Sequence, residues 1–135
     1  MPSYWLLKTE PSTYSFERLV KEGQAVWDGV RNNLALKYLR EMKAGDQVLI
    51  YHSGDDKAVV GQAKVVKAAY PDPNADDPKL VVVDLVPAGA LGKPVPLSAI
   101  KAESSLGDLP LVRMPRLSVM PVPAEAWKKI LSMGK

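Results

Sequence analysis

The chain has 135 residues, and its 18 lysines and arginines outnumber its 15 aspartates and glutamates, which gives a formal net charge of +3. Because it contains no cysteine and a single histidine, disulfides, thiol nucleophiles and the usual zinc sites are excluded. This length predicts one domain, residues 1–135, large enough to fold without a metal or disulfide. Walker, GxGxxG, HExxH and GxSxG motifs are also missing, so we expect neither a metal nor an organic cofactor.

The first half of the chain predicts one strand followed by two helices. The aromatic and apolar run 4–8 predicts a buried strand, which Pro11 ends. Apolar residues at helical spacing predict a short helix between Ser15 and Gly23. A second helix is expected over 34–42, because its apolar residues fall on one stripe.

The second half predicts more strands and two short helices. Rows of β-branched residues predict strands at 47–51, 57–68, 79–86 and 117–122. Helices are expected at 94–102 and 123–134, and an exposed loop at 71–78. Since long alternation of strands and helices is missing, the fold class is α+β, a small curved mixed sheet or open barrel with helices outside.

Neither the charge distribution nor the hydropathy identifies a partner. No block of like charges is present, so any phosphate-binding surface must be assembled by the fold. No apolar run approaches the roughly 18 residues of a membrane span, and the opening Met-Pro-Ser-Tyr-Trp does not resemble a secretory signal. We therefore expect a soluble, cytoplasmic monomer without a membrane partner.

The most unusual stretch is the polar turn that follows Trp27 and opens the second helix. Arg31 and Asn32 add hydrogen-bond donors at a helix start, where unpaired backbone N–H groups favour anions and ligand oxygens. Trp27 would supply a flat stacking surface beside them. An alternative interpretation places Trp27 in the core and gives Asp28 or Asn32 a helix-capping role. The residues alone leave both interpretations open.

Two strand ends carry further polar side chains. Strand alternation places Lys8 and Glu10 on one face of the strand and Thr9 on the opposite face. The alternative interpretation is that Lys8 and Glu10 form a simple surface ion pair. His52 stands at the end of the strand 47–51, where it either contacts a ligand or serves the structure.

Two arginines lie in an apolar, proline-punctuated segment near the C-terminus. Side chains such as Arg113 and Arg116 in these surroundings usually pair with a carboxylate, and less often with phosphate. Trp127 lies at helical spacing with Ile130 and Leu131, which favours a place in the core.

Four segments, taken in this order, resemble the EVE domain over residues 4–127. They are YWLLKTEP (4–11), WDGVRNNLA (27–35), GDQVLIYHS (45–53) and PLVRMPRLSVMPV (110–122). The resemblance implies a PUA-like fold, related to YTH readers of methylated adenosine and to ASCH domains, with a curved barrel-like sheet and flanking helices. It also implies a non-catalytic module that binds modified DNA or RNA and flips a modified base, such as a modified cytosine, into a pocket.

Carried onto this chain, the resemblance implies a site built from three segments. The base pocket is expected to comprise Lys8, Glu10, Pro11, Ser12, Trp27, Asp28, Gly29, Val30, Asn32, His52 and Ser53. Phosphate contacts are expected from Arg31, Lys37, Arg40 and Lys43. The family offers no catalytic residue to carry over. A nucleic-acid partner implies association with the nucleoid in a bacterium, or a nuclear location in a eukaryote.

Two other functions stay open at this stage. ASCH-like relatives can use threonine, lysine and glutamate to hydrolyse acylated cytidine, and Lys8, Thr9 and Glu10 are consecutive here. Strand alternation argues against this hydrolase, because Thr9 should face away from the other two. A domain that binds a small molecule or a protein is the third function, for which no residue gives direct evidence.

Overall fold

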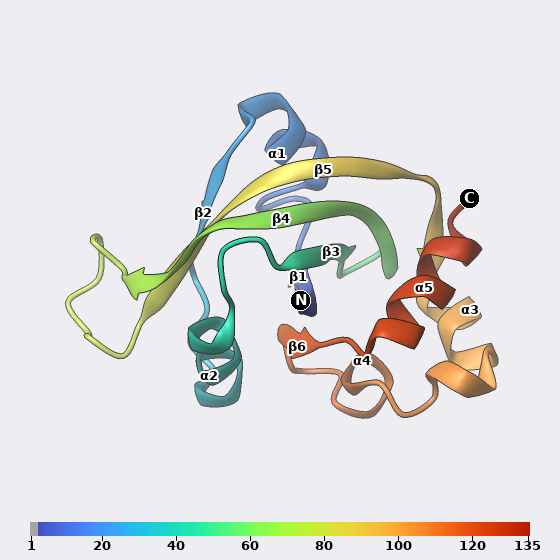
Figure 1. Ribbon diagram of the computed structural model, residues 1–135. Helices are drawn as coiled ribbons and strands as arrows, with labels where there is room; N and C mark the ends of the chain where they lie inside the picture. Colours follow the sequence, from blue (N-terminus) through green and yellow to red (C-terminus); the bar gives the residue numbers. More distant parts are fainter. Residues whose placement is uncertain (1–2) are drawn as a thin grey trace.

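A computed structural model of the chain describes residues 3–135. Its strands are β1 (Tyr4–Thr9), β2 (Ala25–Trp27), β3 (Gln47–His52), β4 (Ala58–Pro71), β5 (Val81–Pro96) and β6 (Val119–Pro121). They form one six-stranded sheet in the order β2-β5-β4-β3-β1-β6. Figure 1 shows that this sheet is curled, with the long strands β4 and β5 arching over β3, β1 and β6.

The central strands β1 and β3 run parallel, and all other neighbours are antiparallel. Leu6 pairs with Leu49, and both side chains are fully buried, as a strand covered on both faces requires. The mixed sheet and its flanking short helices confirm the α+β class that the sequence predicts.

A buried carboxylate aligns β1 with β3. Asp46 accepts hydrogen bonds from the backbone N–H of Ser3 (3.0 Å) and Lys43 (2.9 Å) and from Trp5 Nε1 (2.9 Å). These three hydrogen bonds offset part of the cost of burying the carboxylate. The register that follows brings Thr9 beside His52 at the other end of both strands.

Short helices flank the sheet. They are α1 (Phe16–Glu22), α2 (Asn33–Glu41), α3 (Leu97–Ala102), α4 (Pro110–Arg113) and α5 (Ala124–Met133), with a 3-10 turn at Ser104–Leu106. In Figure 1, α3, α4 and α5 gather near the C-terminus, whereas α1 lies above β5. Helix α2 contacts β4, β5 and β6. Within residues 3–135, no helix is both long and apolar enough to cross a membrane.

Two sequence predictions of elements are wrong in their bounds. Strand β5 continues far beyond residue 86, so residues 94–96 are strand and the helix expected over 94–102 begins only at Leu97. Strand β4 supplies the pairing partner, and register shifts between the two strands accommodate the prolines and glycines of β5. These bulges also increase twist, which contributes to the curl of the sheet.

Strand β2 is absent from the predictions, because three residues give too short a pattern. It pairs with β5, where Trp27 lies opposite Val83. By contrast, α1 begins after Ser15 and ends at Gly23, and the loop between β4 and β5 is where the sequence predicts it. Trp127 is buried and stacks on Tyr4 with ring centroids 4.7 Å apart, which confirms its predicted place in the core.

Candidate base-binding site

A cavity of about 390 Å³ lies where the end of β1 meets β2 and the segment after it. It is lined by Lys8, Thr9, Glu10, Thr13, Tyr14, Val26, Trp27, Asp28, Gly29, Val30 and Ser118. This volume is near the lower end of the range of about 300–1,000 Å³ for small-molecule pockets. The end of β1 and the stretch 27–30, both expected at the site, are thus brought together.

An aromatic corner forms one side of this cavity. The rings of Tyr14 and Trp27 meet edge to face, with centroids 6.0 Å apart and an interplanar angle of 90°. Trp27 is only 7% exposed and belongs to the main apolar core. The two interpretations of Trp27 are therefore compatible, because one side chain both packs in the core and lines the cavity.

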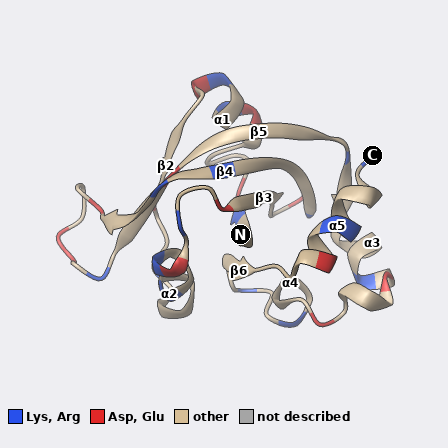
Figure 2. Cartoon of the chain, viewed as in Figure 1, with Lys and Arg blue, Asp and Glu red and all other residues tan. Residues whose placement is uncertain are grey.

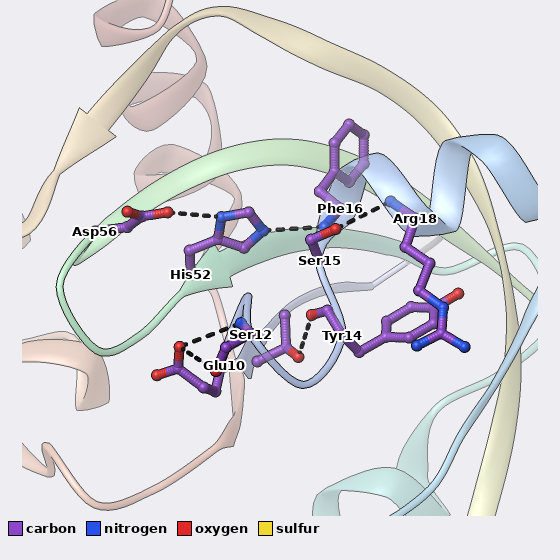
Figure 3. A network of polar contacts seen from close by, with 9 residues as sticks. Glu10, Ser12, Tyr14, Ser15, Phe16, Arg18, His52 and Asp56 are labelled. Carbon is purple, nitrogen blue, oxygen red and sulfur yellow. Dashed lines mark hydrogen bonds and ion pairs between the residues drawn. The ribbon is translucent and has the colours of Figure 1, made fainter.

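Tyr14 is held in place from the side of α1. Its hydroxyl donates to Glu22 Oε1 (2.7 Å), and the Arg18 guanidinium lies 5.0 Å from its ring centroid. Figure 3 shows Arg18 beside this ring. Burial, followed by the hydrogen bond to Glu22, raises the pKa of Tyr14 to about 12. The phenol is therefore protonated at neutral pH.

Lys8 brings an ammonium group to the cavity. Its Nζ donates to the carbonyl of Pro115 (2.8 Å) and lies 5.6 Å from the ring centroid of Tyr51. Burial lowers the pKa of Lys8, and burial also raises the pKa of Tyr51. The ammonium is thus partly desolvated, which strengthens its interaction with a polar ligand.

Thr9 and Glu10 are engaged by different partners. The Thr9 hydroxyl donates to the carbonyl of Tyr14 (2.6 Å), whereas Glu10 Oε1 accepts from the backbone N–H (3.3 Å) and hydroxyl (3.1 Å) of Ser12. Glu10 also lies against Gly54, whose φ of 75° suits glycine and where any side chain would clash with the carboxylate. The Thr9 hydroxyl is therefore not directed to Lys8 or Glu10.

His52 links β3 to the start of α1. Its Nε2 accepts the backbone N–H of Phe16 (2.9 Å), so the ring hydrogen lies on Nδ1, which faces Asp56 Oδ2 at 3.1 Å. The side chain is 6% exposed, and Figure 3 shows it directed toward α1. Both ring nitrogens of His52 therefore have partners within the protein, which is the structural role that the sequence left open. Neither His52 nor Ser53 is among the residues that line the cavity, and the backbone N–H of Ser53 donates to the carbonyl of Thr9 (2.9 Å), which does line it.

Asn32 caps α2. Its Oδ1 accepts the backbone N–H of Ala35 (3.0 Å), the geometry of the capping interpretation. It lines a neighbouring recess of about 410 Å³, together with Leu34, Met114, Pro115, Arg116 and Leu117. Pro11 and Ser12 lie in the turn after Glu10.

The four residues expected to bind phosphate lie in different environments. Arg31 lines a recess with the aspartates of the β4–β5 loop, and Arg40 donates to the Lys79 carbonyl (2.7 Å). Lys37 is exposed on α2, and Lys43 lines a recess that also contains acidic side chains. Figure 2 shows basic and acidic residues interspersed over the chain, with acidic positions in the loop that projects beyond β4 and β5.

Sequence reasoning missed part of the cavity lining. Thr13, Tyr14, Val26 and Ser118 line it, yet they belong to no chemical motif. The only available signal was the position of Tyr14 directly after the strand end that carries Lys8 and Glu10. Within residues 3–135, no group of three histidine or acidic side chains is arranged to hold a metal ion.

Comparison with known proteins places this geometry in a family. The EVE domain matches residues 3–133. Mouse thymocyte nuclear protein 1 is 34% identical, with 98% of this chain and 74% of that protein covered. An NMR structure from Rhodopseudomonas palustris has a TM-score of 0.93 and 43% identity, with 98% and 92% of the two chains covered.

Two further structures define the limits of the likeness. Human THYN1 protein, solved in complex with DNA containing 5-methylcytosine, has a TM-score of 0.90 and 30% identity and covers 98% of each chain. An ASCH protein from Zymomonas mobilis reaches a TM-score of 0.60 at 12% identity over 98% and 96% of the two chains, a likeness of fold alone. The resemblance read from four sequence segments is thereby confirmed, and the chain belongs to the EVE domain family.

Proposed function

We propose that this chain binds nucleic acid that carries a modified base, with modified cytosine in DNA as the candidate, and holds that base flipped into the cavity lined by Tyr14 and Trp27. This cavity of about 390 Å³ is called the principal cavity below, because the end of β1 and the stretch 27–30, both expected at the site, meet there. The composition of the cavity carries this proposal: an aromatic corner stands beside two carboxylates and a partly desolvated ammonium. A reader of a flipped base needs a stacking surface, groups that address the base edge and positive charge for the backbone.

Each group has a role that follows from its chemistry. The rings of Trp27 and Tyr14 provide the apolar surface against which a base packs. The carboxylates of Glu10 and Asp28 suit the exocyclic amino group of cytosine, which donates hydrogen bonds. Lys8 suits the carbonyl oxygen on the same edge. We assign no step of bond breaking to these residues, and the Thr9 hydroxyl is already engaged by the Tyr14 carbonyl.

The human relative supports modified DNA as the partner. THYN1 protein was solved with DNA that contains 5-methylcytosine, and it shares 30% identity over 98% of this chain. The bacterial relative from Rhodopseudomonas palustris shares the fold at a TM-score of 0.93.

The test is a binding screen with oligonucleotides that differ only at one base, cytosine or 5-methylcytosine, each prepared as DNA and as RNA. We expect saturable binding with preference for the modified DNA. Asp28→Asn should weaken binding to the modified strand by roughly 5- to 150-fold, the range for loss of one good base-edge contact. Asp55→Asn, at the exposed turn after β3, serves as the matched control and should change nothing.

Two outcomes would contradict the proposal. Equal affinity for the modified and unmodified strands, in both DNA and RNA, would exclude recognition of 5-methylcytosine. Release of acid from acylated cytidine during incubation would favour the hydrolase, and Thr9→Val should then abolish turnover.

A further inference from the structure

A rigid turn borders the principal cavity, and the proposed function does not use it. The turn 114–117 is closed by the Leu117 backbone N–H, which donates to the Met114 carbonyl (3.0 Å), with Pro115 at the second position that suits proline. The Pro115 carbonyl accepts from Lys8 Nζ (2.8 Å), and Leu117 is buried. The turn is therefore attached to the rest of the protein at its second and its last residue.

Two side chains of this turn, Met114 and Arg116, are exposed. Met114 is 44% exposed, one of few large apolar side chains that stay accessible. Arg116 is exposed and makes no hydrogen bond or ion pair with any of residues 3–135. Arg113 differs, since it pairs with Asp108 (2.7 Å) and donates to the Gly107 carbonyl (3.3 Å). Arg116 is thus the arginine of this segment that is available to a ligand.

The turn 114–117 lines its own recess next to the cavity. This recess of about 410 Å³ is apolar apart from Arg116 and Asn32, and no acidic residue lines it. It lies beside the principal cavity, because Leu117 lines one and Ser118 lines the other, and Lys8 of the cavity contacts Pro115. An exposed apolar side chain next to an unpaired cation complements a nucleic-acid duplex, which presents stacked bases between phosphates.

We propose that the turn 114–117 is a second DNA contact, in which Met114 inserts into the base stack where the flipped base has left and Arg116 pairs with a neighbouring phosphate. Flipping a base costs stacking, and methionine is among the apolar wedges that proteins insert between base steps. Phosphate is the usual partner of an arginine that positions a duplex. This inference rests on the proposed function, because it needs a base in the principal cavity.

The test compares Met114→Ala with the wild type on a 5-methylcytosine duplex and on the same modified strand without its complement. We expect the substitution to weaken duplex binding about tenfold and single-strand binding less than twofold, because only the duplex has a stack to fill. Val20→Ala is the matched control, since Val20 is 52% exposed on α1 and lines none of these recesses. Thermal unfolding of each variant should match the wild type.

Arg116 is tested through the salt dependence of duplex binding. Arg116→Gln should lower the slope of log affinity against log salt by about one, equally for modified and unmodified duplexes. Arg113→Gln, whose arginine is already paired with Asp108, should leave the slope unchanged.

The outcomes separate this inference from the proposed function. Suppose that the wild type prefers the modified duplex, but Met114→Ala leaves duplex affinity unchanged or weakens duplex and single-strand binding equally. The insertion of Met114 as a wedge is then overturned, and the proposed function stands. If the wild type shows no preference for the modified base, the proposed function fails and the wedge fails with it.

Discussion

Trp27 belongs both to the core and to the lining of the candidate cavity. Its indole packs in the core with 7% of its surface exposed, and the same ring lines the cavity beside Tyr14. If the proposed function holds, a substitution of Trp27 changes both the free energy of unfolding and the free energy of binding, so each has to be measured separately. Residue type alone presents core and pocket as alternatives for Trp27, whereas a residue at the edge of the core both packs inward and lines a cavity.

We predict that Trp27→Ala lowers the free energy of unfolding by about 3–5 kcal/mol, the usual cost of truncating a buried tryptophan. In the folded fraction, loss of the stacking surface should weaken binding to the modified strand roughly 5- to 150-fold. Trp27→Phe should recover part of both quantities. Denaturant unfolding and binding titrations on the same preparations provide the two numbers.

Trp127→Phe is the matched control for Trp27→Phe. Trp127, in α5, is as deeply buried, but it stacks on Tyr4 and is not among the residues that line the cavity. Both phenylalanine variants should lose some stability, and only Trp27→Phe should lose affinity. Unchanged affinity in Trp27→Phe and in the folded fraction of Trp27→Ala would restrict Trp27 to the core.

Single residues of the site differ in how well the sequence predicts them. Lys8, Glu10 and the stretch 27–30 carry unusual chemistry in unusual places, so they were identified and they line the cavity. Tyr14 was missed, because its place depends on contacts with Glu22, Arg18 and Trp27 that only the folded chain brings together. His52 has the chemistry of a ligand contact, yet its partners across the fold occupy both nitrogens.

At the scale of elements, the sequence predicts the bounds of a helix well where a capping side chain marks its start. It predicts a strand poorly where pairing with a neighbouring strand determines its length. Helices α1 and α2 have capping side chains, Ser15 and Asn32, which are visible in the sequence. Strand β5 contains prolines and glycines that argue against a strand, and its pairing with β4 overrides them. Strand β2 is short and owes its existence to the same pairing.

Asn32 allows a prediction at this scale. Asn32→Ala should lower the free energy of unfolding by about 0.5–2 kcal/mol, because the N–H of Ala35 loses its cap. Asn32→Ser keeps a capping oxygen and should restore most of that stability. Because Asn32 lines the recess beside the turn 114–117, we expect both variants to keep the preference for the modified base.

Base preference is the measurement that distinguishes the two roles of Asn32. If its amide addresses the base edge, Asn32→Ser should retain stability and lose the preference, since serine lacks the amide donors. Melting temperatures and affinities for the paired oligonucleotides, measured on both variants, decide between these outcomes.

At the scale of the whole molecule, the curl of the sheet assembles the site. Residues 8–10, 13–14, 26–30 and 118 come from three separate parts of the sequence and line one cavity. The ends of β1 and β2 approach because the sheet curls, although three strands, β5, β4 and β3, separate them in the strand order. Such closure depends on bulges and twist, for which periodicity in the sequence gives no signal.

The distribution of basic side chains over the whole molecule can be tested through the salt dependence of binding. Figure 2 shows lysines and arginines at positions spread along the chain, so a modest net charge of +3 does not by itself locate the nucleic acid. If the residues near α2 contact phosphates, their neutralisation should weaken modified and unmodified strands alike and flatten the salt dependence. The variant that tests this carries glutamine at Arg31, Lys37, Arg40 and Lys43.

The control has to change the same net charge elsewhere. Glutamine substitutions at four lysines of the α3 and α5 end provide it, namely Lys93, Lys101, Lys129 and Lys135. Both variants lose the same formal charge, so a general effect of charge would lower the salt slope equally in both. We expect a lower slope in the first variant only, and least from Arg31, because the aspartates of the β4–β5 loop share its recess. An equally lowered slope in both variants would indicate a general effect of charge. A slope that the first variant leaves unchanged would show that the backbone crosses another face, since phosphates contribute to the slope only where side chains meet them.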